Sequence, residues 1–210
     1  VANAYLWLLG AASAGETGFL SQVIKAQHDR VPANRSVLET LDRRGAWRKM
    51  GEEYLGKVRE LAPSGRRIID KMPFNFATVG MARLMYPNAT IIHVKRDPLD
   101  TCVSCLSNNF KSPNLCFEPQ ELGRMYGIYE SFMAHWHHLF PGGILDVRYE
   151  DLVSNPLDVS KRIAEHVGLE WSEGMIEVQE SAEPCATASA AQVRRPLYAS
   201  SIGMWKNYAG

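Results

Sequence analysis

The sequence predicts an α/β protein in which a parallel sheet is covered by helices on both faces. Four short apolar runs have the length and composition of buried strands: residues 4–9, 67–70, 89–94 and 144–149. Helical segments separate these runs, and strands that alternate with helices pair in parallel through crossover connections. In open sheets of this kind, ligands bind beyond the carboxyl ends of the strands.

The predicted helices have apolar residues at a spacing near 3.6 and end at turn residues such as the proline and two glycines at 141–143. They cover residues 17–27, 35–62, 76–85, 101–110, 122–139 and 158–167. The tail from 183 to 201 is irregular and polar. Because no repeat or linker interrupts the pattern, we expect one domain over residues 1–210. The chain has no initiator methionine, which indicates a fragment of a longer protein.

Composition excludes several classes of protein. With 46% hydrophobic and 22% charged residues, the chain has the composition of a soluble globular protein. Its 23 basic and 23 acidic residues balance, so no nucleic-acid or membrane-surface partner is expected. No apolar run approaches the roughly 18 residues of a membrane span, and we expect a cytoplasmic protein. The CVSC sequence of Cys102 to Cys105 has no second Cys/His pair, which favours buried thiols over a redox or zinc motif.

A glycine pair near the start of the chain has the spacing of a phosphate-binding loop. The stretch GAASAGET follows an apolar run, precedes a predicted helix, and offers backbone N–H groups and one hydroxyl to a phosphate. Its candidate binding residues are Gly10, Ser13, Ala14, Gly15, Glu16 and Thr17. No cation lies within the stretch, and Glu16 would repel a phosphate. By itself the stretch is equally consistent with a structural turn from strand to helix.

Two basic residues follow predicted strands and would lie at the ligand-binding edge. Lys71 follows the second strand, and Arg96 ends the third, with Ser104 eight residues later in the next helix. A guanidinium at a strand end and a hydroxyl in the following helix can bind the same phosphate. The alternatives are a surface lysine, and an Arg96 paired with Asp97 or Asp100 beside a core-facing serine.

Four motifs in order then resemble a known family. They are DKMPFNF at 70–76, IIHVKRDPLDTCVS at 91–104, DVRYEDLV at 146–153, and TASAAQVRRPLY at 187–198 followed by WKNY at 205–208. Together they are similar to sulfotransferases that use 3′-phosphoadenosine 5′-phosphosulfate, particularly the bacterial-type branch related to protein-tyrosine sulfotransferases. The resemblance implies a P-loop-NTPase-like fold of three layers, with a central parallel sheet flanked by helices.

The resemblance also implies roles for individual residues. Arg96 and Ser104 would bind the 3′-phosphate of the donor, and Lys71 would contact the bridging oxygen or the sulfuryl group. Tyr149 would lie near the adenine. Ser189 would lie near the transferring group, and Arg195 would reach the donor phosphates. The implied reaction is in-line transfer of a sulfuryl group to a hydroxyl or amine, with the phosphosulfate as co-substrate and no metal. The acceptor would be a small molecule, a glycan or a protein tyrosine, and the protein is a possible homodimer.

Two positions depart from the family pattern. The family loop typically reads GxPRSGTT, whereas this chain has Ser13 at the arginine position and Glu16 at the first threonine. The family's glutamate base corresponds to the vicinity of Ser36, and Glu39, three residues later, is the nearest candidate. The alternative is that Glu39 is an exposed glutamate on a helix. The alternative for the chain is therefore a catalytically impaired protein that binds nucleotide or acts as a scaffold. A kinase that uses a nucleoside triphosphate is a weaker third hypothesis, because Glu16 opposes it.

The histidines give no clear functional signal. His93 lies in a predicted buried strand, which favours a hydrogen-bonded core residue over a catalytic base. His135, His137 and His138 lie on one predicted helix, but the sequence identifies no carboxylate or cysteine partner for them. We therefore predict no metal site.

Overall fold

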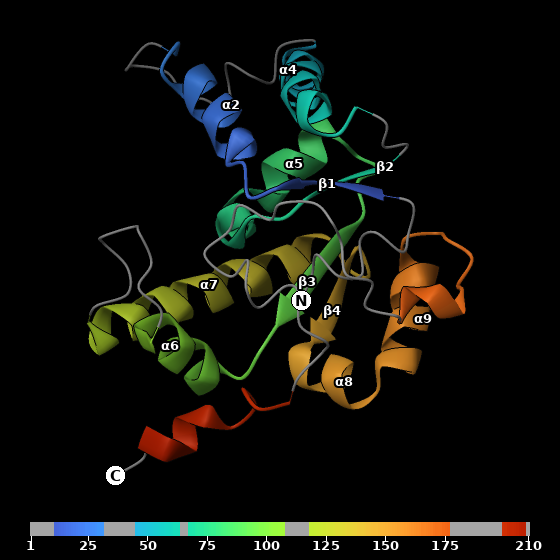
Figure 1. Cartoon of the computed structure of the whole chain (residues 1–210). Helices are drawn as coiled ribbons and strands as arrows, with labels where there is room; N and C mark the ends of the chain where they lie inside the picture. The colour runs from blue at the N-terminus through green and yellow to red at the C-terminus, as the bar shows by residue number, and fades with distance from the viewer. Residues whose placement is uncertain (1–10, 32–44, 64–66, 108–117, 177–198, 209–210) are drawn as a thin grey trace. The chain divides into compact units, whose positions relative to one another are not determined.

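The structure is a computed structural model, and it describes residues 11–31, 45–63, 67–107, 118–176 and 199–208 (Figure 1). The chain divides into two compact units. One comprises residues 10–89, and the other comprises residues 90–210 together with residues 1–9. Each unit contains its own pair of parallel strands and is described separately below.

The unit of residues 10–89 is built on strands β1 (Ala11–Gly15) and β2 (Arg67–Asp70), which pair in parallel. Its helices are α2 (Phe19–His28), α4 (Ala46–Leu61), η2 (Pro73–Thr78) and α5 (Val79–Met85). The core of this unit contains the buried side chains Leu20, Val23, Met50 and Met85. These residues come from α2, α4 and α5, so the apolar faces of three helices share one core.

The unit of residues 90–210 is built on strands β3 (Ile91–Lys95) and β4 (Ile144–Arg148), which also pair in parallel. The helices are α6 (Pro98–Ser107), α7 (Pro119–Leu139), α8 (Tyr149–Ser154), α9 (Pro156–His166), η3 (Glu173–Met175) and η4 (Met204–Tyr208). Three of these helices begin with a proline, whose fixed φ suits the first helical position. The core contains Val147, Leu152, Val159 and Ile163.

The prediction of parallel strands alternating with helices is confirmed, but several boundaries were wrong. Residues 11–15, expected within a loop, form β1, because their backbone groups pair with β2. Tyr149, expected in the fourth strand, begins α8 instead. The expected strand at 4–9 lies outside the described residues, and the single domain remains a prediction. Among the described helices, none has the length and apolar character needed to cross a membrane.

The core of the second unit gives a test of stability. Leu152 is 2% exposed and packs with Val147, Val159 and Ile163. Its replacement by alanine leaves a cavity, and we expect Leu152→Ala to lower the free energy of unfolding by about 2–5 kcal/mol. The control Leu157→Ala removes a side chain that is 38% exposed, and should cost about 0.5 kcal/mol or less. Urea denaturation of both variants measures the difference, and equal costs would contradict this core assignment.

Candidate functional site

The end of β1 brings Glu16 and Lys71 together. Gly15 has φ of 75° and turns the chain after β1, and its carbonyl oxygen accepts a bond from the Lys71 N–H at 3.4 Å. The Lys71 ammonium donates to Glu16 Oε1, and the two side chains are 32% and 30% exposed. Lys71, to which the family resemblance assigns contact with the sulfuryl group, is therefore paired with Glu16, the residue that replaces a threonine of the family loop.

The other residues of the predicted phosphate loop have structural partners. Ala14 is buried, and Thr17 Oγ1 accepts from the Phe19 N–H at 3.2 Å, a local bond just before α2, whose N-cap residue is Gly18. Because residues 11–15 form a strand, the prediction of a loop between Gly10 and Gly15 is wrong. Gly10 and the side chain of Ser13 lie outside what the structure describes, so phosphate binding by this stretch stays a prediction.

The end of β2 is fixed by a half-buried hydrogen bond next to Lys71. The Tyr54 hydroxyl donates to Asp70 Oδ2 at 2.7 Å. Burial raises the pKa of Asp70, while hydrogen bonds from Tyr54 and Asn75 oppose that shift. Burial also raises the pKa of Tyr54. This contact ties α4 to β2 and so fixes the backbone from which Lys71 extends.

In the second unit, Arg96 lies at the centre of a polar cluster that we call the Arg96 cluster: Arg96, Asp100, Tyr149 and Ser201. The guanidinium carbon of Arg96 lies 5.4 Å from the centre of the Tyr149 ring, within the range of a cation–π interaction. Its Nη2 donates to the Ser201 carbonyl oxygen, and Asp100 Oδ2 is 4.0 Å away. The side chain is 20% exposed. Its Nε is buried and has no hydrogen-bond partner among the described residues.

The structure brings the predicted donor-binding residues Arg96 and Tyr149 together here. It adds Asp100 and Ser201, which were not predicted to bind the donor. Tyr149 is 6% exposed, and its hydroxyl lies 3.2 Å from Ser201 Oγ. Ser104 lies in α6, is half-buried, and follows Asp100 by one helical turn. The expected pair of Arg96 with Asp100 exists, but Asp100 is 1% exposed and belongs to the interior. Ser189, Arg195 and Glu39 lie outside the described residues.

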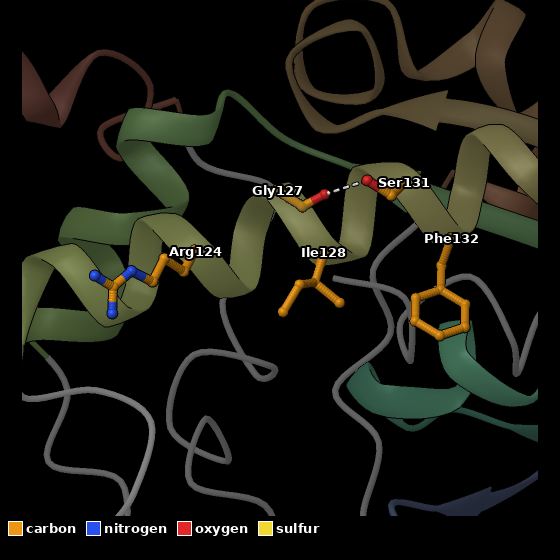
Figure 2. Close-up of a pocket in the computed structure, with 5 residues that line it drawn as sticks. All are labelled: Arg124, Gly127, Ile128, Ser131 and Phe132. Carbon is orange, nitrogen blue, oxygen red and sulfur yellow. Dashed lines mark hydrogen bonds between the residues drawn. The ribbon is translucent and has the colours of Figure 1, made fainter.

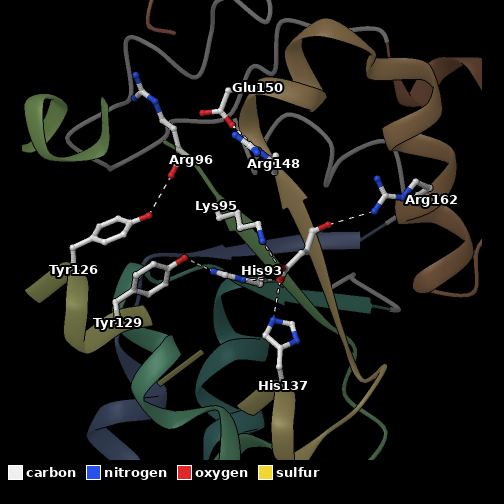
Figure 3. Close-up of polar contacts among 10 residues, drawn as sticks. His93, Lys95, Arg96, Tyr126, Tyr129, His137, Arg148, Glu150 and Arg162 are labelled. Atoms are coloured by element: carbon white, nitrogen blue, oxygen red, sulfur yellow. Dashed lines mark hydrogen bonds and ion pairs between the residues drawn. The ribbon is translucent and has the colours of Figure 1, made fainter. Parts of the chain in front are cut away.

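A second polar network centres on Asp146 of β4 (Figure 3). Its Oδ1 lies 2.8 Å from His93 Nδ1 and 3.0 Å from His137 Nε2, and its Oδ2 accepts from the Lys95 ammonium. His93 Nε2 bonds the Tyr129 hydroxyl. This confirms His93 as a hydrogen-bonded residue, and Asp146 is the carboxylate partner of His137 that the sequence did not reveal. The network ties β3 and β4 to α7.

Hydrogen bonds and one ion pair set the charges in this network. Burial lowers the pKa of His93, against opposing contributions from Asp146, so the ring is neutral at pH 7. Burial raises the pKa of Asp146, but hydrogen bonds from Lys95 and His93 outweigh burial and bring it to about 2. Ligand atoms of His93, His137 and Asp146 lie within 4.8 Å of one another, a set that zinc could use. Each of these atoms already has a hydrogen-bond partner, and Lys95 neutralises the carboxylate.

A pocket of about 480 Å³ lies along one face of α7 (Figure 2). Arg124, Gly127, Ile128, Ser131 and Phe132 line it. It shares no residue with the Arg96 cluster.

Parallel strands and a half-buried arginine at the end of β3 define an α/β protein with a site suited to an anion, and the comparisons with known proteins identify the family. The chain belongs to the sulfotransferase family, whose model matches residues 15–173. An uncharacterized protein of Aquifex aeolicus (strain VF5) is 38% identical over 159 residues, which are 74% of this chain and 21% of that protein. The chain thus spans about a fifth of that relative.

Solved structures support the fold. The sulfotransferase domain from the curacin biosynthetic pathway superposes with a TM-score of 0.62 at 13% identity, over 91% of this chain and 80% of that one. The sulfotransferase domain from the Synechococcus PCC 7002 olefin synthase superposes with a TM-score of 0.50 at 16% identity, over 93% of this chain and 86% of that one. The predicted family and P-loop-like fold are confirmed, while the tyrosine-sulfotransferase branch remains a prediction.

The Asp146 network predicts an acid-sensitive contribution to stability. Because the pKa of Asp146 is lower in the folded chain than its ordinary value of 3.8, this stabilisation is complete above pH 3.8 and is lost as the pH falls towards about 2. Asp146→Asn should flatten the fall of the unfolding free energy between these values. Urea denaturation from pH 2 to pH 7 measures it, with exposed Asp151→Asn as control. Parallel curves for Asp146→Asn and the unchanged chain would contradict the network.

Proposed function

We propose that this chain transfers a sulfuryl group from 3′-phosphoadenosine 5′-phosphosulfate to an acceptor hydroxyl or amine. Membership of the sulfotransferase family supports the reaction type. The observation that carries the proposal is the Arg96 guanidinium, which lies on the Tyr149 ring with a buried and unpartnered Nε among the described residues. A buried donor without a partner costs about 1–3 kcal/mol, so an anion that accepts from it is stabilised at this position.

The residues present suit the nucleotide end of the donor. An arginine presents planar N–H groups that match two oxygens of one phosphate. The guanidinium is positioned by a neutral carbonyl and an aromatic ring, and the carboxylate of Asp100 lies at 4.0 Å and is occupied with two backbone N–H groups. Ser104 in α6 would add a hydroxyl to the same phosphate, and Tyr149 would contact the adenine.

The chemistry requires charge to be stabilised on the leaving group. The acceptor atom bonds to sulfur, the bond from sulfur to the bridging oxygen breaks, and adenosine 3′,5′-bisphosphate leaves with that electron pair. A cation beside the bridging oxygen stabilises the developing charge, and we assign this role to Lys71. We assign proton removal from the acceptor to Glu39, with Ser189 and Arg195 near the transferring group, as the family resemblance implies.

A second candidate is a nucleotide-binding protein with impaired transfer, and the ion pair of Lys71 with Glu16 favours it. While Glu16 accepts from the ammonium, Lys71 stabilises a protein carboxylate rather than a leaving group. Transfer of labelled sulfate from the donor to phenols, sugars and tyrosine peptides separates the candidates. Turnover supports the first, and nucleotide binding without turnover supports the second.

Arg96→Ala tests the nucleotide site. Its loss should weaken binding of adenosine 3′,5′-bisphosphate by about 2–5 kcal/mol, the range for truncating one partner of a buried charged contact. Isothermal titration calorimetry measures the affinity. Arg124→Ala is the control, because Arg124 is 70% exposed and pairs only with Glu121 in α7 among the described residues. An unchanged affinity in Arg96→Ala would remove Arg96 from the proposed site.

Glu16→Gln tests whether the ion pair limits transfer. Removing the carboxylate frees Lys71 and removes repulsion of the donor, which for unit charges about 4 Å apart is roughly 1 kcal/mol in water, or about fivefold in affinity or rate. We expect kcat/KM for sulfate transfer to rise by about that factor. In a Lys71→Ala background the same substitution should give a smaller gain. An equal gain in both backgrounds would show that Glu16 does not act through Lys71.

A further inference from the structure

We propose that Asp100 is a positioning residue for the nucleotide site, because its buried carboxylate holds the C-terminal turn (residues 201–205) against the start of α6. This part of the inference concerns the fold of the second unit alone. Its consequence for nucleotide affinity rests on the function proposed above. The sequence resemblance assigns no role to Asp100, which the sequence offers only as a possible surface partner of Arg96.

The carboxylate of Asp100 is bound by backbone N–H groups more than 100 residues away. Its Oδ2 accepts from the Gly203 N–H at 2.6 Å, and its Oδ1 accepts from the Trp205 N–H at 3.0 Å. Gly203 has φ of 74°, a conformation that side chains disfavour, and the turn at this glycine brings the two N–H groups to one carboxylate. Both oxygens of Asp100 are therefore used by the turn.

Burial makes these two bonds important. Asp100 is 1% exposed, and an ionised carboxylate in the interior is tolerated only when it is hydrogen-bonded and close to a positive charge. The two N–H groups satisfy the oxygens, Arg96 supplies the charge at 4.0 Å, and the first turn of α6 adds its positive dipole end. Release of the turn would remove two of the strongest bonds of a buried charge.

The same turn contacts the nucleotide-binding residues. The Ser201 carbonyl oxygen accepts from Arg96 Nη2, and Ser201 Oγ lies 3.2 Å from the Tyr149 hydroxyl. Asp100 holds the turn at 203 and 205, while Arg96 and Tyr149 meet it at 201. Fixing one end of this short segment therefore fixes the atoms against which the guanidinium is oriented, so Asp100 acts on nucleotide affinity through the turn.

Hydrogen exchange measured by mass spectrometry tests the contact itself. In Asp100→Asn, an amide N–H of the side chain replaces one acceptor, and we expect exchange in residues 199–208 to rise by about tenfold while β4 keeps its protection. Asp158→Asn is the matched control, because Asp158 also lies in the first turn of a helix but is exposed. Unchanged exchange in residues 199–208 would overturn the proposal, as would an equal rise in β4, which would indicate general unfolding.

Calorimetry with adenosine 3′,5′-bisphosphate tests the consequence. Asp100→Asn should bind the nucleotide about tenfold more weakly, and the loss should be smaller in an Arg96→Ala background, because both residues act on one contact. A merely structural role would give equal losses in both backgrounds. If exchange rises but affinity is unchanged, the link to the nucleotide site is wrong. If the unchanged chain does not bind the nucleotide, the proposed function fails, while the exchange experiment still decides the role of Asp100.

Discussion

The geometry of the candidate site depends on one turn, in which β3 ends, Arg96 follows and α6 begins. Asp97 accepts from the Asp100 N–H at 3.0 Å and so caps α6, and its own N–H donates to Glu150 of α8 at 2.8 Å. The Tyr126 hydroxyl of α7 donates to the Arg96 carbonyl oxygen at 3.3 Å (Figure 3). Because side chains satisfy these backbone groups, Arg96 extends from a fixed backbone, and fixed cations bind anions without a further ordering cost.

The two candidate cations differ in what an incoming anion must displace. Arg96 is positioned by a carbonyl oxygen and an aromatic ring, the Asp100 carboxylate lies 4.0 Å from its Nη2 and is already bound by two backbone N–H groups, and its Nε has no hydrogen-bond partner among the described residues. Lys71 is paired with a carboxylate, which competes directly with a phosphate or a sulfuryl oxygen. The unit that carries Arg96 is therefore prepared for an anion, whereas Lys71 becomes available only when Glu16 moves or is neutralised.

Local patterns predicted the alternation of strands and helices and the position of Arg96 at a strand end, because both depend on neighbouring residues. The predicted phosphate loop coincides with strand β1, since the spacing of Gly10 and Gly15 does not show that residues 11–15 pair with β2. The long-range contacts of Asp146 and Asp100 were missed for a different reason. Their partners, His93 and Gly203, are 53 and 103 residues away, and no periodicity or motif connects positions at that separation.

Under the proposed function, nucleotide affinity and catalysis draw on different residues of this chain. A contact of Arg96 with the 3′-phosphate would be the same before, during and after transfer, so it would contribute uniform binding and would not accelerate the chemical step. Acceleration requires a contact that strengthens as charge develops on the bridging oxygen, which is the role that we propose for Lys71. A chain with an intact Arg96 cluster and a paired Lys71 can therefore bind the product nucleotide well and still transfer slowly. In such a chain the charge at position 16, rather than the Arg96 cluster, would set the rate of the proposed transfer.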